Sequence, residues 1–113
     1  MAKILLLGLD RPIADDLIAV LQQLGQSVQS AAIGSGALES GEINLIFADS
    51  DNLSAIRRSR PDLPVVVVSR LPEVSAWLDA LEQGAVDYCG APFERKQVSW
   101  VLNSSLPAFR TAA

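Results

Sequence analysis

The chain has 113 residues, a length that suits one domain built around one hydrophobic core. Half of the residues are hydrophobic and 19% are charged, a balance typical of a folded globular protein, which excludes a disordered chain. The formal net charge is −4 and the basic residues are scattered, so we expect no direct binding to nucleic acid. No apolar run is long enough to cross a membrane or to form a secretion signal, so we expect a cytoplasmic protein without a membrane partner.

Few residues are available for metal binding or covalent catalysis. One cysteine excludes an internal disulfide, and the lack of histidine excludes His-based metal sites and Ser-His or Cys-His pairs. We expect Cys89 to be a small buried strand residue and not a redox centre. These absences remove the commonest sites of those kinds, and we expect a chain that is not an enzyme and holds no resident metal or cofactor.

Apolar runs alternate with helical patterns along the chain. Strands are expected at 3–7, 27–31, 44–48, 64–68 and 85–89. Helices with capping or stop signals are expected at 11–24, 53–59, 71–83 and 94–105, with one short, poorly formed helix between 34 and 41. In the helix 71–83, the spacing of Val74, Leu78 and Leu81 predicts the face that packs on the sheet.

This order of elements predicts the fold class. Strands that alternate with helices through short connections form an α/β fold, here a three-layer α/β/α sandwich around a five-stranded parallel sheet. We expect one domain over residues 1–106 and a tail or the start of a linker over 107–113.

Asp49 stands out because a carboxylate follows directly on a buried apolar run. That run reads as a strand buried on both faces, so Asp49 lies at the carboxyl edge of the sheet, where ligands and chemistry gather in open α/β folds. Two interpretations stay open: a chemical role for the carboxylate, or the N-cap of the helix that follows.

Polar features fall at the carboxyl ends of three strands, at Asp49, at Ser69 and in the loop with Ala91. In the order and spacing of these features, the chain resembles the CheY-like receiver domain of bacterial two-component response regulators. The resemblance covers essentially the whole chain. The matching segments are 3–7, 49, 69, 84–88 and 91–93. The resemblance places Asp49 on the phospho-accepting aspartate, Ser69 on the switch serine or threonine, and Tyr88 on the switch aromatic residue. It implies a flavodoxin-like sheet of order 2-1-3-4-5.

The chain departs from this family where Mg²⁺ and the phosphoryl group bind. Gly8 and Leu9 stand where the family has an acidic pair, and Ala91 stands at the family's lysine. Phosphoryl transfer to a carboxylate brings negative charges together. In the family, Mg²⁺ bound by the acidic pair and the charge of the lysine offset that repulsion. The resemblance is therefore to a degenerate, or pseudo-, receiver domain that lacks a metal site, with weak Mg²⁺ binding as the alternative.

Arg70 follows the switch serine, where the family usually has a small residue. One interpretation is that its guanidinium reaches Asp49 and acts as a fixed cation in the pocket. The other is that Arg70 points to solvent at the start of the next helix. An Asp49–Arg70 separation too long for a direct ion pair would count against the first.

Receiver domains typically dimerise or dock through their fourth helix, fifth strand and fifth helix. That region of this chain contains Trp77, Tyr88 and Trp100, and aromatic side chains are enriched among interface hot spots. The alternative is that both tryptophan rings cover the seam between helix and sheet as part of the core margin.

These observations lead to one main expectation and two alternatives. We expect an atypical receiver domain in bacterial signal transduction or transcription regulation, which binds a protein partner or a second copy as a homodimer without conventional phosphorylation of Asp49. It stands alone or belongs to a longer regulator with a C-terminal output domain. The first alternative is a phosphorelay receiver that phosphorylates Asp49 with weakly bound Mg²⁺. The second is a small-ligand module at the strand-end crevice, which no particular residue supports.

Overall fold

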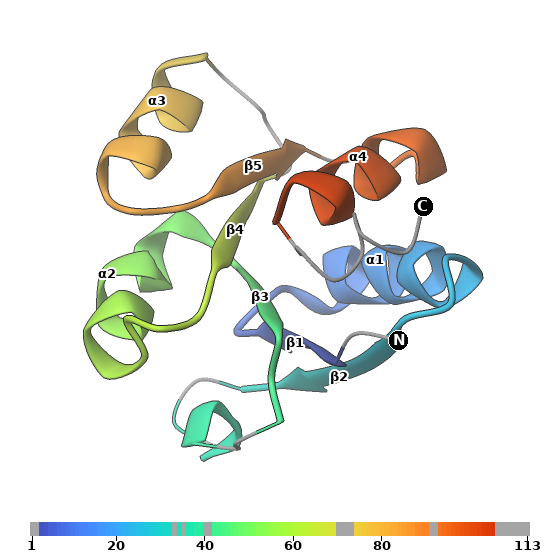
Figure 1. Cartoon of the computed structure of the whole chain (residues 1–113), viewed down its shortest axis with the longest axis horizontal. Coiled ribbons are helices and arrows are strands. Elements are labelled where there is room, and N and C mark those ends of the chain that lie inside the picture. The colour runs from blue at the N-terminus through green and yellow to red at the C-terminus, as the bar shows by residue number, and fades with distance from the viewer. Residues whose placement is uncertain are drawn as a thin grey trace.

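The computed structural model describes residues 3–32, 34, 36–39, 42–69, 74–90 and 93–105, with backbone alone for 74–77. Its strands are β1 (Lys3–Leu7), β2 (Ser27–Ala31), β3 (Leu45–Ala48), β4 (Val65–Ser69) and β5 (Asp87–Gly90). Its helices are α1 (Arg11–Gln23), α2 (Ser50–Ser59), α3 (Val74–Glu82) and α4 (Arg95–Ser105), with a 3-10 turn, η1, at Ala37–Glu39 (Figure 1). Strands and helices alternate as predicted, and η1 takes the place of the weak helix expected between β2 and β3.

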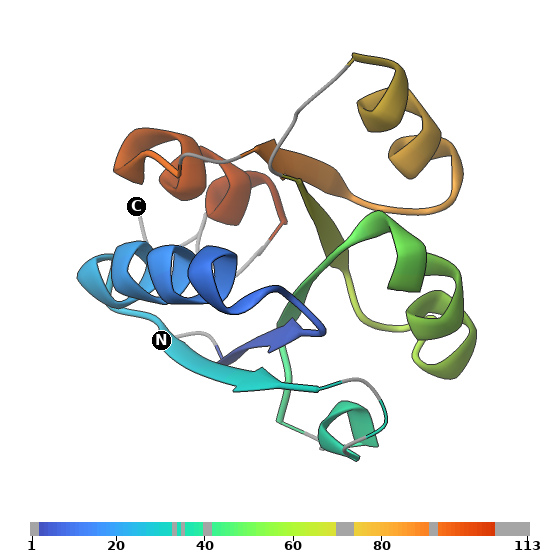
Figure 2. The same cartoon turned by 180° about the vertical axis from the view of Figure 1, so that it is seen from behind.

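The five strands form one parallel sheet with the order β2-β1-β3-β4-β5, as the resemblance implied. β1 and β3 lie at the centre of the sheet and pair from Ile4 with Leu45 to Leu7 with Ala48. Over these paired residues the side chains are buried on both faces, which explains why Ile4–Leu7 and Leu45–Ala48 are continuous apolar runs. β2 and β5 are the edge strands (Figure 2). The sequence of β2 is the more polar, and its residues are the more exposed.

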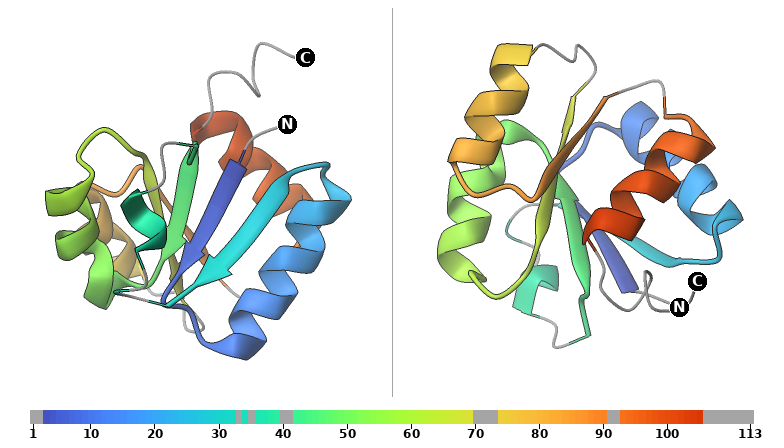
Figure 3. Two further views of the ribbon diagram at one scale, coloured as in Figure 1. Left: turned by 90° about the horizontal axis from the view of Figure 1, so that it is seen from below. Right: turned by 45° about the horizontal axis from the view of Figure 1, so that its top comes forward.

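The sheet separates two hydrophobic layers. α1 and α4 cover one face, where Leu6, Phe47 and Val66 belong to the core, and α2 and α3 cover the other, where Leu5, Ile46 and Val67 do (Figure 3). Successive strand residues alternate between the two cores because side chains of a strand point to opposite faces. The three-layer α/β/α fold that was predicted is therefore confirmed.

α3 presents a different face to the sheet from the predicted one. Leu78 is 53% exposed and Leu81 is 37% exposed, whereas Ala80 is 2% exposed and packs into the core beneath α2 and α3. The prediction that Leu78 and Leu81 point inward was therefore wrong. The small side chain of Ala80 lies against the sheet, and the bulkier leucines on the other side of the helix face solvent.

Other boundaries differ by a few residues. α2 begins at Ser50, earlier than expected, because Asp49 caps its first turn. β5 begins at Asp87 instead of residue 85. Among the described helices, none has the length and hydropathy that a membrane crossing requires. Residues 106–113 lie outside the described part of the chain, so the boundary expected at residue 106 stays a prediction.

Candidate functional site

Asp49 lies at the carboxyl edge of the sheet and begins α2. Its side chain accepts hydrogen bonds from the backbone N–H of Asn52, at 3.2 Å, and from the side-chain amide of the same residue. The backbone of Asp49 is extended, as is usual for an N-cap residue. The capping interpretation of Asp49 is confirmed, and it makes Asn52 a neighbour of this carboxylate that the sequence analysis had not singled out.

Ser69 ends the strand next to the one that carries Asp49. Ala48 pairs with Val67 in the parallel register, so both polar residues lie at the same edge of the sheet. Ser69 is half-buried and pairs with Gly90 of β5. Asp49 and Ser69 therefore lie at one edge of the sheet, as their positions after two predicted parallel strands indicated.

Tyr88 lies on β5, beside Val67, and packs against the core beneath α2 and α3. The residue is half-buried, but its hydroxyl is buried and has no hydrogen-bond partner in the described part of the chain. The ring therefore points into the molecule instead of across its surface. Tyr88 can contribute little polar contact to a docking surface while it holds this conformation.

The loop after β1 contains the residues that replace the family's acidic pair. Gly8 has a φ of +71°, and its N–H donates a hydrogen bond to the carbonyl of Ala31 at 3.0 Å. Leu9 packs against the core beneath α1 and α4. Asp10 is exposed and occupies the N-cap position of α1. The two replacements thus have structural roles of their own, one in the β1–β2 ladder and one in the core.

Three predicted site positions fall outside what the structure describes. Arg70 and Ala91 are not described, nor is the side chain of Trp77. The pairing of Arg70 with Asp49 therefore stays a prediction. Within the described ranges, no group of three or more His, Cys, Asp or Glu side chains is placed to hold a metal ion.

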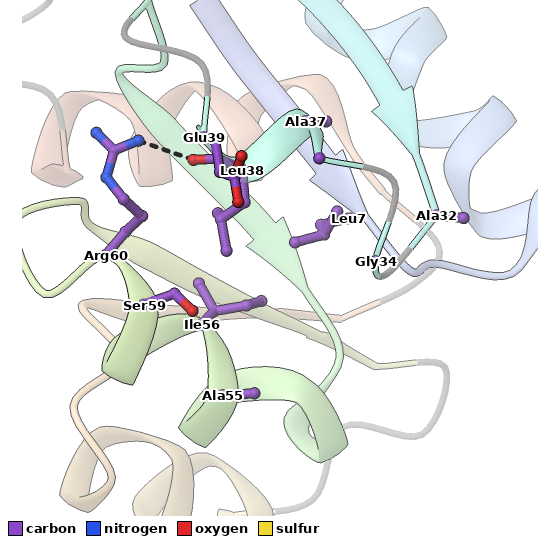
Figure 4. Close-up of a pocket in the computed structure, with 11 residues that line it drawn as sticks. Leu7, Ala32, Gly34, Ala37, Leu38, Glu39, Ala55, Ile56, Ser59 and Arg60 are labelled. Atoms are coloured by element: carbon purple, nitrogen blue, oxygen red, sulfur yellow. Dashed lines mark hydrogen bonds between the residues drawn. The ribbon is translucent and has the colours of Figure 1, made fainter.

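A hollow of about 450 Å³ opens between η1 and the second half of α2. Figure 4 shows Leu7, Leu38 and Ile56 around it, with Arg60 and Glu39 at its margin. The short turn η1 covers less of the sheet than a full helix would, and the hollow lies beside it. No residue of the hollow had been predicted to belong to a site.

Arg60 holds η1 against the end of α2. Its guanidinium donates one hydrogen bond to the carbonyl of Leu38, at 2.8 Å, and two to the carboxylate of Asp62, each at 3.1 Å. These hydrogen bonds from Arg60 lower the pKa of Asp62, and the same pairing raises the pKa of Arg60. Sequence periodicity gave no signal for this contact, because Leu38 and Arg60 are far apart along the chain.

A second hollow, of about 660 Å³, lies between the end of α1 and the exposed side of α4. We call it the α4 groove, and its lining residues are Leu24, Arg95, Lys96, Ser99, Trp100 and Asn103. Trp100 is 73% exposed, so its ring does not cover the seam between helix and sheet. Tyr88 and Trp100 were predicted to share one partner surface, but they belong to opposite sides of the sheet.

Cys89 is a residue of β5, and its side chain lies in the core beneath α1 and α4. Burial, together with the nearby charge of Asp87, raises the pKa of the thiol to about 12. The thiol is therefore protonated at neutral pH and shielded from reagents. The expectation of a buried structural cysteine is confirmed.

Comparisons with known proteins agree with this architecture. No protein-family model matches the chain. The nitrogen assimilation regulatory protein NtrX of Azorhizobium caulinodans is 29% identical over 97% of this chain and 27% of its own length. The DNA-binding transcriptional regulator NtrC of Azospirillum brasilense is 31% identical over 94% of this chain and 25% of its own length. The chain thus spans about a quarter of the length of these curated relatives.

Solved structures share the fold. NtrX from Brucella abortus in complex with ADP matches with a TM-score of 0.83 and 24% identity, over 99% of this chain and 28% of that chain. A response regulator receiver domain protein from Clostridium thermocellum matches with a TM-score of 0.79 and 18% identity, over the full length of both chains. The beryllofluoride-activated NtrC4 receiver domain dimer matches with a TM-score of 0.78 and 18% identity, over 96% of this chain and 99% of that chain.

The parallel sheet of order β2-β1-β3-β4-β5, with helices on both faces, is the fold of CheY-like receiver domains. In sequence the chain is similar to part of the regulators NtrX and NtrC.

Proposed function

We propose that this receiver domain is of the degenerate type and signals by protein contact, without conventional phosphorylation of Asp49. In this proposal it has no enzymatic activity, needs no Mg²⁺ and works in the cytoplasm. Because the relatives are about four times as long, it serves as a module of a longer regulator, with an output domain that controls transcription.

The proposal rests on the structural roles of residues 8 and 9 in the loop after β1. Position 8 is a glycine with φ of +71° whose N–H completes the β1–β2 ladder, and Leu9 packs into the core. Neither residue can supply a carboxylate beside Asp49. Mg²⁺ requires oxygen ligands in near-octahedral geometry, and the charge that a phosphoryl group adds to Asp49 would then have little to offset it.

The hydrogen bonds of Asp49 support the same proposal. Its carboxylate accepts the N–H groups of Asn52 and so stabilises the first turn of α2. A phosphoryl group on this carboxylate would compete with that cap. Tyr88 adds a second argument. The resemblance to receiver domains implies that an inward switch aromatic residue belongs to the active state, and the ring of Tyr88 points inward. A domain held in an active-like conformation needs no phosphorylation to bind its partner.

A phosphodonor assay tests the proposal. The chain is incubated with acetyl phosphate and Mg²⁺, and its intact mass is recorded beside that of a phosphorylatable receiver domain under the same conditions. We expect no phosphoryl adduct on this chain. An adduct that disappears in Asp49→Asn would overturn the proposal, because that variant keeps the capping geometry and loses the acceptor.

The second candidate is a phospho-accepting receiver that uses Asp49. The position of Asp49 and Ser69 at one edge of neighbouring strands favours it. Arg70 would then supply the missing positive charge. In that case the adduct would form slowly, and Arg70→Ala would abolish it, whereas a change at Arg11, an exposed residue on α1, would not.

A further inference from the structure

The hollow between η1 and α2 exists because the helical layer on this face of the sheet is thin at one end. η1 is a single turn, whereas α2 and α3 are full helices. Five of the eleven residues that line the hollow are glycine or alanine, so the described side chains leave room beside that turn. The volume of about 450 Å³ lies within the range of about 300–1,000 Å³ that is usual for small-molecule sites.

The lining of the hollow is mostly apolar. Leu7 and Ile56 lie buried at its floor, and Leu38 stands half-buried in the wall that η1 forms (Figure 4). Ala55 is exposed on the opposite wall, which α2 forms. Ser59, one turn further along α2, adds a hydroxyl that can both donate and accept a hydrogen bond. An apolar surface with few polar groups is typical of a site for a small, largely apolar molecule.

The charged residues of the lining favour an uncharged ligand. They are Arg60 and Glu39, which is exposed at the margin. The guanidinium of Arg60 donates two hydrogen bonds to the carboxylate of Asp62, each at 3.1 Å, so Asp62 offsets its charge. The carboxylate of Glu39 faces water, where a pair of opposite charges contributes little. A charged ligand would therefore give up its hydration with little compensation.

The hydrogen bond from Arg60 to the carbonyl of Leu38, at 2.8 Å, favours a compact ligand. Arg60 is the C-cap residue of α2 and Leu38 belongs to η1, so the contact joins the two walls of the hollow (Figure 4). A helix with its side chains is about 10–12 Å wide and needs an unobstructed trough. This bridge therefore argues for a small molecule and against a helix of a partner protein.

We propose that the hollow binds an uncharged, largely apolar small molecule that carries a hydroxyl or a similar hydrogen-bonding group. The apolar part lies against Leu38 and Ile56, between η1 and α2, and the polar group reaches the hydroxyl of Ser59. This inference goes beyond the function proposed above and does not depend on it, because Asp49 is not among the residues that line the hollow.

The test is a titration of the chain with 2-naphthol at pH 7, followed by amide NMR. This probe is an uncharged pair of fused rings with one hydroxyl group. We expect saturable shifts at Leu38, Glu39 and Ile56, with a dissociation constant below about 1 mM, and none on α4, which covers the other face of the sheet. Naphthalene-2-sulfonate has the same rings and a negative charge, and it should bind at least about threefold more weakly.

Two variants fill the hollow from exposed positions of α2. Ala55→Phe places a ring in the hollow and should weaken the binding of 2-naphthol at least about tenfold. Ser59→Phe, at another exposed lining position, should have the same effect, so the result does not depend on one variant. Ser54→Phe is the matched control and should leave binding unchanged, because Ser54 is exposed on the same helix but is not part of the lining. Amide spectra without the probe show whether each variant keeps the fold.

Several results would overturn the proposal: no saturable shift in the unaltered chain, shifts centred on α4, equal binding of the sulfonate, or binding that survives in both filled variants. A chain that binds no 2-naphthol and takes up no phosphoryl group would overturn this site and leave the proposed function standing. A chain that binds 2-naphthol in the hollow and also forms the adduct on Asp49 would do the reverse. The two proposals can therefore fail separately.

Discussion

The carboxylate of Asp49 accepts the backbone N–H of Asn52 at 3.2 Å and thereby caps α2. The residue that the family resemblance assigns to phosphorylation thus holds together the first turn of the helix that follows it. This single contact connects the stability of the domain with the proposal that Asp49 is not an active phospho-acceptor.

Asp49→Ala is expected to destabilise the domain by about 1 kcal/mol, because the N-cap hydrogen bonds of α2 are lost. Asp49→Asn should cost less than Asp49→Ala, since asparagine is an equally favoured cap. Urea unfolding of the two variants beside the unaltered chain measures the difference. Equal stability of Asp49→Ala and the unaltered chain would show that the cap contributes nothing.

Gly8→Ala is expected to destabilise the domain by about 1–2 kcal/mol, because an alanine at φ of +71° occupies the left-handed region. Gly8→Asn is the matched control, since asparagine tolerates that region better and should cost less. Thermal unfolding of both variants tests this. An alanine variant as stable as the asparagine variant would contradict the assigned backbone conformation.

The thiol of Cys89 is expected to make stability fall at alkaline pH. Burial raises its pKa from 9.0 to about 12, so the unfolded chain releases this proton at lower pH than the folded chain. The free energy of unfolding should therefore fall between pH 9 and 12, by at most about 1.4 kcal/mol per pH unit from this group. Urea unfolding at several pH values should show a steeper fall for the unaltered chain than for Cys89→Ala. Parallel curves would mean that the thiol ionises equally in both states.

Arg60→Ala is expected to loosen η1 and to destabilise the domain, because the carbonyl of Leu38 and the carboxylate of Asp62 lose a hydrogen-bond donor. The amide of Glu39, which donates to the carbonyl of Gly36 within this turn, should exchange faster with deuterium. Arg58→Ala on the exposed side of α2 is the control and should leave that amide unchanged. Unaltered exchange at Glu39 in Arg60→Ala would show that Arg60 does not hold the turn.

The layers of this fold could be predicted from the sequence because strands that are buried on both faces appear in it as uninterrupted apolar runs. Runs such as Ile4–Leu7 and Val65–Val68 have no polar residue that a solvent-exposed face would require, so they specify central parallel strands. The order of the strands came from the family resemblance, since apolar patterns contain no information on which strands are neighbours. The capping role of Asp49 was one of two interpretations that local sequence allowed.

The orientation of α3 and the contacts of Arg60 could not be predicted in the same way. Periodicity marks Leu78 and Leu81 as one stripe of α3, but it does not show that Ala80, on another stripe, fits closer to the sheet. Arg60 reaches Leu38 across a distance of 22 residues in sequence, and no local rule selects that acceptor. The separation of Tyr88 from Trp100 likewise depends on which face of the sheet each element covers.

The most direct test of the central claim is a titration of the chain with Mg²⁺ and beryllofluoride, followed by amide NMR at Asp49, Ser69 and Tyr88. A receiver domain that signals by contact alone should show no saturable shift at these residues at millimolar Mg²⁺. Saturable shifts that spread from Asp49 to Tyr88 would contradict the claim and show that the domain is a working phospho-switch.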